Sequence, residues 1–161
     1  MKAQSIHTML KYQQMPRVKK EEVQTSEESP KDFIAGTGRR KTAVARVFLF
    51  KDKGDITVNG ISINDYFPSE KDRIKWMRPF HIIGVSHPNS QFSATIKVYG
   101  SSKSSQLNAI IHGLSRTLSK LSEENSQLLR KQGLLTRDSR MVERKKYWFR
   151  KARKTPQYSK R

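Results

Sequence analysis

The chain has 161 residues, of which 33 are Lys or Arg and 14 are Asp or Glu, so its formal charge is +19 at pH 7. A free soluble domain usually keeps a much smaller net charge, and self-repulsion of this size is tolerated where a polyanion neutralises it. The absence of cysteine excludes disulfides, thiolate metal sites and cysteine nucleophiles. No run approaches the roughly 18 apolar residues of a membrane span, and the first ten residues lack the apolar core of a secretory signal. We therefore expect an intracellular protein with no membrane partner.

The first 32 residues differ in composition from those that follow. Residues 1–20 carry five basic residues and no acid, which is typical of an organellar targeting segment, although only one of the five is arginine. Residues 21–32 are acidic and polar and include Pro30. We expect residues 1–32 to form a flexible N-terminal extension that stays on the protein, with folded structure beginning at Phe33.

Three segments have the pattern of β-structure. Residues 42–50 (TAVARVFLF) are rich in branched and aromatic residues and contain no Gly or Pro. They predict a strand in which the small Ala43 and Ala45 let another element pack closely. Residues 56–63 contain Asn-Gly between apolar pairs, which predicts a hairpin. Residues 92–99 alternate apolar and polar side chains, as in a half-buried strand.

Helices are predicted in three further segments. Residues 64–76 are a helix candidate that contains Pro68. Residues 107–121 carry apolar side chains at helical spacing, which predicts an amphipathic helix. Residues 123–132 begin with two glutamates and have a lysine in the last turn, as the helix dipole favours, and Gly133 is a candidate C-cap. The order of these elements predicts an α+β domain.

A short basic segment, residues 36–42 (GTGRRKT), precedes the first predicted strand. Its glycines allow close backbone approach, and Arg39, Arg40 and Lys41 are suited to phosphate contacts. The spacing does not fit a nucleotide-binding P-loop, which closes with Gly-Lys-Ser/Thr and leads into a helix. Two interpretations stay open, a plain turn and a contact to a polyanion.

A second candidate anion site lies at residues 100–106 (GSSKSSQ), ahead of the amphipathic helix. Serine hydroxyls, Lys103 and free backbone N–H groups at a helix start can bind an anion, and an ordinary N-cap loop has the same composition. The four histidines have no metal-ligand spacing, and no Ser, His and acid are arranged for catalysis. We interpret His112 as a helix-surface residue and Trp76 and Phe80 as core residues. No cofactor, metal or small-molecule substrate is expected.

Residues 137–161 are the most basic part of the chain. They contain eleven Lys and Arg against two acids, with four aromatic rings among the charges. Such a segment cannot bury enough apolar surface to fold alone, so we expect it to become ordered on a partner. Cations at this density are suited to a phosphate backbone, and the rings add stacking surfaces for unpaired bases. The segment therefore predicts an RNA- or DNA-binding tail.

An ordered series of short motifs runs through the chain. They are GTGRRKTAVAR at 36–46, TVNG at 57–60, His112, Gly113, Arg116, GLLTRDSR at 133–140, VERKK at 142–146, KARK at 151–154, PQ at 156–157 and SKR at 159–161. In this order they closely resemble the universal small-subunit ribosomal protein nine family in its bacterial or organellar form. The resemblance covers about residues 33–161, and the complete series is far more specific than any one motif.

The resemblance implies a fold and a location. The fold would be an α+β two-layer sandwich of the ribosomal-protein-five domain-two type at residues 33–135, followed by an extended basic tail at residues 136–161. The protein would bind small-subunit ribosomal RNA in the head of the subunit, beside neighbouring head proteins. Its tail would contact peptidyl-site tRNA, and the protein would catalyse no reaction.

The same resemblance implies which residues carry these contacts. Ribosomal RNA would be bound by cations of the body and the tail, namely Arg39, Arg40, Lys41, Arg46, Lys103, Arg116, Arg137, Arg140, Arg144, Lys145, Lys146, Arg150, Lys151, Arg153 and Lys154. The terminal Ser159, Lys160 and Arg161 would contact the tRNA.

Three features depart from the family pattern. The loop at residues 101–105 is rich in serine where the family has glycine, residues 147–149 are large aromatics where it has glycine and smaller residues, and Tyr158 replaces phenylalanine. With the N-terminal extension, these departures favour a mitochondrial ribosome, in the mitochondrial matrix, over a plastid or the bacterial cytoplasm. Two alternatives from other classes are the basic protein subunit of an RNA-processing ribozyme and a small-molecule kinase of a related fold. The absence of any acid from residues 33–50 speaks against the kinase.

Overall fold

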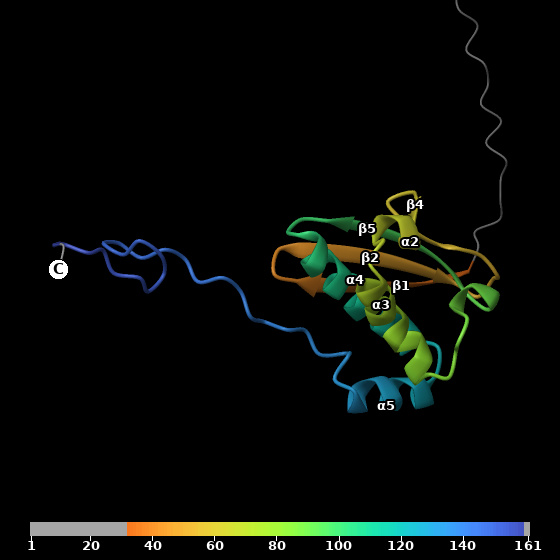
Figure 1. Cartoon of the computed structure of the whole chain (residues 1–161). Helices are drawn as coiled ribbons and strands as arrows, with labels where there is room; N and C mark the ends of the chain where they lie inside the picture. Colours follow the sequence, from red (N-terminus) through yellow and green to blue (C-terminus); the bar gives the residue numbers. More distant parts are fainter. Residues whose placement is uncertain (1–31, 160–161) are drawn as a thin grey trace, which may run out of the picture. The chain divides into compact units, whose positions relative to one another are not determined.

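A computed structural model describes residues 32–159, and Figure 1 shows their helices and strands. The strands in this part of the chain are β1 (Phe33–Arg40), β2 (Ala43–Phe50), β3 (Ile56–Val58), β4 (Ile61–Ser62) and β5 (Ser93–Tyr99). The helices are α2 (Ile63–Tyr66), α3 (Glu70–Ile82), α4 (Lys103–Leu118), α5 (Glu123–Lys131) and the short 3-10 helix η2 (Pro88–Ser90). This mixture confirms the predicted α+β class. The predicted extension lies outside the described residues, apart from Asp32.

The five strands form one sheet in the order β1-β2-β5-β3-β4. β3 and β5 run parallel, and the three other neighbouring pairs are antiparallel. The predicted hairpin is confirmed, because Asn59 and Gly60 connect β3 to β4 with φ angles of 51° and 85°. Positive φ at both central residues is what a two-residue hairpin turn of this kind requires. β1 is left at the edge of the sheet.

One face of the sheet is buried beneath helices. Along β2 the side chains of Ala43, Ala45, Val47 and Leu49 are buried, whereas Arg46 on the opposite face is exposed. α4 packs against both β1 and β2 on the buried face. The prediction that the two alanines allow another element to approach closely is therefore confirmed.

The segment 36–42, predicted to precede the first strand, is itself the end of a strand followed by a turn. Residues 36–40 belong to β1, and only Lys41 and Thr42 form the turn into β2. Lys41 takes the positive φ of 51° in this turn, although it is not a glycine.

The two glycines of β1 serve close packing against α4. A Cβ added to Gly38 would lie 1.9 Å from the carbonyl oxygen of Ala109 and 2.4 Å from the backbone nitrogen of Gly113. A Cβ added to Gly36 would lie 2.6 Å from Cγ2 of Thr117. Strand and helix thus meet backbone to backbone, and we call this contact the β1–α4 seam.

The helices follow the predicted spacing except around one proline. The sequence predicts one helix at residues 64–76, but the structure has α2 and α3 separated at Pro68, since the residue before a proline disfavours helical backbone. Trp76 and Phe80 of α3 are buried, as predicted. α4 and α5 are confirmed, and Gly133 follows α5 with a φ of 69°, as a helix-ending glycine does. None of the helices in residues 32–159 is both long and apolar enough to cross a bilayer.

Candidate nucleic-acid interface

The outer edge of β1 is covered by polar side chains of α4 and of the turn that follows it. Lys120 Nζ donates to the carbonyl oxygen of Ala35 at 2.6 Å, and Arg116 Nη1 donates to that of Thr37 at 2.9 Å. Residues 112 and 116 are one turn apart on the same face of α4, and Lys120 follows four residues later in the turn after the helix ends at Leu118. Unpaired backbone groups on an edge strand invite pairing with another chain. These side chains satisfy them within the molecule.

His112 completes this row and joins three segments of the chain. Its Nδ1 accepts a hydrogen bond from the backbone N–H of Arg39 at 3.2 Å, and its Nε2 lies 3.2 Å from the carbonyl oxygen of Leu135. Both contacts are satisfied by the neutral ring with its proton on Nε2. Burial lowers the pKa of His112, and the positive charges of Arg116 and Arg137 lower it further, against the raising effect of the Leu135 hydrogen bond. His112 is therefore a half-buried junction between β1, α4 and the segment after α5, and not a simple helix-surface residue.

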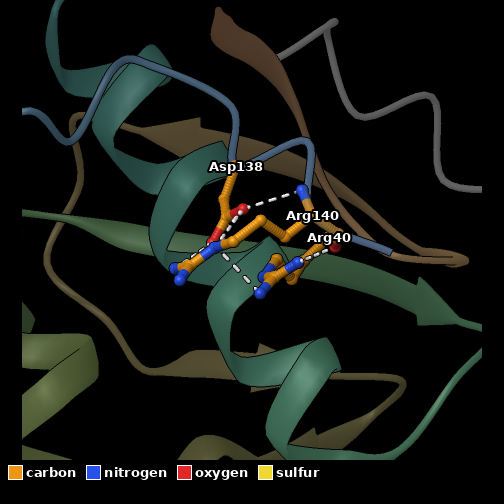
Figure 2. A network of polar contacts seen from close by, with 3 residues as sticks. All are labelled: Arg40, Asp138 and Arg140. Atoms are coloured by element: carbon orange, nitrogen blue, oxygen red, sulfur yellow. Dashed lines mark hydrogen bonds and ion pairs between the residues drawn. The ribbon is translucent and has the colours of Figure 1, made fainter. Parts of the chain in front are cut away.

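The start of the tail is tied to β1 by a cluster of two arginines and one aspartate. Figure 2 shows the Asp138 carboxylate between Arg40 and Arg140, with Arg40 Nη2 at 3.0 Å and Arg140 Nη2 at 2.8 Å from Oδ2. Arg40 also donates to the carbonyl oxygen of Arg140. We call these three residues the latch. The latch joins Arg40 to two residues that follow it by 98 and 100 positions in the sequence. We call residues 133–140 the tail root, and this segment lies against the body.

The charges of the latch stabilise one another. Hydrogen bonds from the side chain and backbone of Arg140 hold the pKa of the Asp138 carboxyl well below its usual range. The same pair raises the pKa of Arg140. Only 16% of the Arg40 side chain is exposed. The carboxylate is thus ionised throughout the physiological range, and it partly neutralises the arginines around it.

Two hollows open beside the latch and share Arg39 and His112. One, of about 320 Å³, is lined by Arg39, Arg40, Asn108, Ile111, His112, Gly133, Leu134, Thr136, Asp138 and Arg140. The other, of about 450 Å³, is lined by Thr37, Arg39, His112, Arg116, Leu135 and Arg137. We call the pair the arginine groove. Five arginines and a single acid line it, which makes it a concave cationic surface suited to phosphate.

The second cationic region lies further along the tail. Arg153 forms a two-pronged ion pair with Glu143, with Nη2–Oε1 at 2.7 Å and Nε–Oε2 at 3.0 Å. The hydrogen bonds of this pair lower the pKa of Glu143 and raise that of Arg153. The backbone N–H of Arg150 donates to the carbonyl oxygen of Lys154 at 2.7 Å. We call residues 143–154 the tail loop.

The predicted RNA-binding side chains fall into two groups. Those held by another residue of 32–159 are Arg40, Lys103, Arg116, Arg140 and Arg153. Those without a hydrogen bond or ion pair to another residue in this range are Arg39, Lys41, Arg46, Arg137, Arg144, Lys145, Lys146, Arg150, Lys151 and Lys154. The ten side chains of the second group can meet phosphates without breaking a contact that the structure describes.

Some side chains of the predicted anion site before α4 are engaged in contacts within the protein, while no side chain caps the start of the helix. Lys103 Nζ lies 4.1 Å from the centroid of the Tyr66 ring and donates to the carbonyl oxygen of Tyr66 at 3.3 Å. Ser105 is buried, and its hydroxyl is 3.3 Å from that of Ser102. Of the predicted tRNA contacts, Ser159 is exposed, and Lys160 and Arg161 lie outside the described residues.

Sequence reasoning missed the roles of His112 and Asp138. For His112 the signal was its spacing of four residues from Arg116 and of eight from Lys120, off the apolar stripe of the helix. For Asp138 the signal was a lone acid between arginines in RDSR. Within residues 32–159 no group of three or more His, Cys, Asp or Glu is placed to hold a metal ion.

Comparison with known proteins agrees with the motif series. A sequence model of the family described as Ribosomal protein S9/S16 matches residues 38–161. The chain is also similar to the small ribosomal subunit protein uS9 of Rickettsia felis. The two are 48% identical over 125 residues, which are 78% of this chain and 76% of the relative.

Proposed function

The chain belongs to the ribosomal protein S9/S16 family, as its motifs predicted, and we propose that it is a structural constituent of the small ribosomal subunit that binds ribosomal RNA. This family is not a class of enzymes. The observation that carries the proposal is that ten of the predicted RNA-binding side chains have no hydrogen bond or ion pair to another residue of 32–159. Of these side chains, Arg39 and Arg137 line the arginine groove, Lys41 and Arg46 lie on the sheet and its first turn, and the others lie along the tail, where they can neutralise the RNA backbone.

The proposal extends to a location and a second ligand. The body would adopt the ribosomal-protein-five domain-two fold at residues 33–135 and sit in the subunit head among neighbouring proteins. The tail at residues 136–161 would reach the peptidyl-site tRNA with Ser159, Lys160 and Arg161. The N-terminal extension and the aromatic residues 147–149 support a mitochondrial ribosome. The similarity to the Rickettsia felis protein supports the alternative, a bacterial ribosome.

Salt dependence of RNA binding tests the central claim. Affinity for small-subunit ribosomal RNA should fall steeply with salt, by about 0.7 to 0.9 log units per tenfold salt for each phosphate neutralised. Replacing Arg137 and Arg39 by Ala should lower this slope by roughly one to two units. The matched control is Lys103→Met, which removes a cation already held by Tyr66 and should change the slope less. A flat salt dependence of the unmodified protein would contradict RNA-backbone binding.

The tRNA contact needs a separate test. Deleting residues 159–161 should leave assembly into small subunits intact and weaken retention of peptidyl-site tRNA. Failure of the truncated protein to assemble would show that these residues serve ribosomal RNA and not tRNA. Co-sedimentation of the tagged protein with mitochondrial, and not bacterial-type, small-subunit RNA would decide the location.

A further inference from the structure

The tail loop presents two aromatic rings to solvent. Tyr147 is 82% exposed and Trp148 is 69% exposed. Their ring centroids are 5.1 Å apart with an interplanar angle of 66°. Large exposed aromatics are unfavourable for a soluble chain unless they meet a partner, so their position calls for an explanation.

Local contacts hold these rings at the tip of a closed loop. The backbone N–H of Phe149 donates to the carbonyl oxygen of Lys146 at 3.3 Å, which closes a turn around Tyr147 and Trp148. Trp148 takes a φ of 65° in this turn. That backbone conformation is costly for a bulky residue, and such strain is concentrated at functional sites. The Glu143–Arg153 ion pair joins the two ends of the loop.

The surroundings of the rings are cationic and concave. A hollow of about 600 Å³ is lined by Arg144, Lys145, Lys146, Tyr147, Trp148, Phe149 and Arg150. The only acid in residues 143–154 is Glu143, and its carboxylate is occupied by Arg153. The hollow therefore combines π-surfaces with four cations that have no partner among the described residues. An unpaired nucleotide, with a flat base flanked by phosphates, has the complementary chemistry.

We propose that the tail loop is a preformed site for an unpaired RNA nucleotide, whose base stacks on Trp148 while Arg144, Lys146 and Arg150 contact the flanking phosphates. Glu143 and Arg153 are positioning residues that hold the loop closed. The proposal rests on the RNA-binding function and adds to it a ligand class, because phosphate neutralisation alone is indifferent to the bases. A duplex, whose bases are already stacked, does not fit this site.

Tryptophan emission of the full-length protein provides the readout. The chain has two tryptophans, and Trp76 is buried with 2% exposure, so a ligand in solution reaches only Trp148. The probes are a single-stranded oligoadenylate, an abasic oligonucleotide of equal length and an RNA duplex. Oligoadenylate should quench the emission, whereas the abasic strand and the duplex should bind at low salt and leave it nearly unchanged.

Substitutions separate stacking from charge. Trp148→Leu should weaken oligoadenylate binding by roughly 5- to 150-fold and leave abasic binding and its salt slope unchanged. The matched control is Tyr99→Leu, which removes an aromatic ring of 57% exposure from the sheet and should change neither affinity. Glu143→Gln should reduce quenching, and the charge-swapped pair Glu143→Arg with Arg153→Glu, which keeps the net charge, should restore it.

The outcomes distinguish this proposal from the function on which it rests. Equal quenching by abasic and adenylate strands, or unchanged adenylate affinity in Trp148→Leu, overturns the stacking site and leaves phosphate binding intact. Quenching by a neighbouring ribosomal protein but by no RNA would assign the loop to a protein contact and overturn the proposal. Failure of all three probes to bind at low salt would refute RNA binding itself.

Discussion

The β1–α4 seam and the tail loop are held by different forces. At the seam, backbone meets backbone, and a Cβ on Gly38 would lie 1.9 Å from a carbonyl oxygen. In the tail loop, the Glu143–Arg153 ion pair lies between exposed side chains. Dispersion and close fit are indifferent to salt, whereas exposed charges are screened by it. The body should therefore keep its shape as the salt concentration changes, and the tail loop should respond to salt and to ligands.

The largest expected effect is at the seam. Gly38→Ala would place a methyl group against backbone atoms of Ala109 and Gly113. The helix must shift to accept it, and overpacking of this kind costs about 1–3 kcal/mol or more of the free energy of unfolding. Urea denaturation followed by the emission of Trp76 measures this loss.

Gly36→Ala provides the matched control on the same strand. Its nearest obstacle is Cγ2 of Thr117, the end of a side chain, so the loss should be smaller. Adding Thr117→Ser removes that methyl group and should recover part of the stability. No single side-chain truncation should rescue Gly38→Ala. A rescue there would show that the seam can relax, and the contrast with the tail loop would weaken.

The seam also shows where sequence reasoning stopped. Residues 107–121 and Gly133 could be predicted because helical periodicity and a helix-ending glycine are local signals. β1 could not, because glycines have low strand propensity, and the reason for Gly38 is its contact with Ala109 and Gly113, more than 70 positions away. Its strand structure follows from tertiary packing on α4.

The candidate site divides in the same way. Composition identified the cations of the tail and of residues 39–46, since charge density is readable along the chain. It could not tell that the Arg40 side chain is held by Asp138 while the Arg39 side chain has no partner in residues 32–159, because that difference depends on distances between segments far apart in sequence. The contact of His112 with Leu135 could not be predicted for the same reason, because it joins residues of different segments.

The next largest effect concerns His112. His112→Leu would leave the Arg39 N–H and the Leu135 carbonyl without their partner, at a cost of about 1 kcal/mol. Burial lowers the folded-state pKa of His112 below the ordinary 6.5, so the unfolded chain binds the proton more readily. The contribution is present above about pH 6.5 and is lost as the pH falls through the lowered value. The free energy of unfolding, measured from pH 5 to 8, should depend less on pH in the variant, and an unchanged pH dependence would show that His112 is not its source.

The latch should give a smaller, local effect. Asp138→Asn removes the ion pairs to Arg40 and Arg140 while keeping the side-chain shape. The tail root should then loosen, and its backbone amides should exchange hydrogen several-fold faster, with body amides unchanged. The pKa of Asp138 is lowered in the folded state, so its contribution is present above about pH 3.8 and lost as the pH falls through the lowered value. Asp65→Asn, an equal change of charge on α2, is the control and should leave tail-root exchange unaltered.

The smallest effect on stability is expected at the outer edge of β1. Replacing Arg116 and Lys120 by Met frees the carbonyl oxygens of Ala35 and Thr37, which water can reach, so the loss should be only a few tenths of a kcal/mol. The uncovered edge strand should instead promote self-association of the protein, which sedimentation velocity detects. The control is the double substitution of Arg130 and Lys131 by Met, which removes the same charge and should cause less self-association. A loss of stability as large as that of Gly38→Ala would mean that side-chain hydrogen bonds, and not the close fit of glycine on helix, hold β1 against α4. The seam would then resemble the tail loop in depending on polar side-chain contacts, and its stability should fall as salt is added.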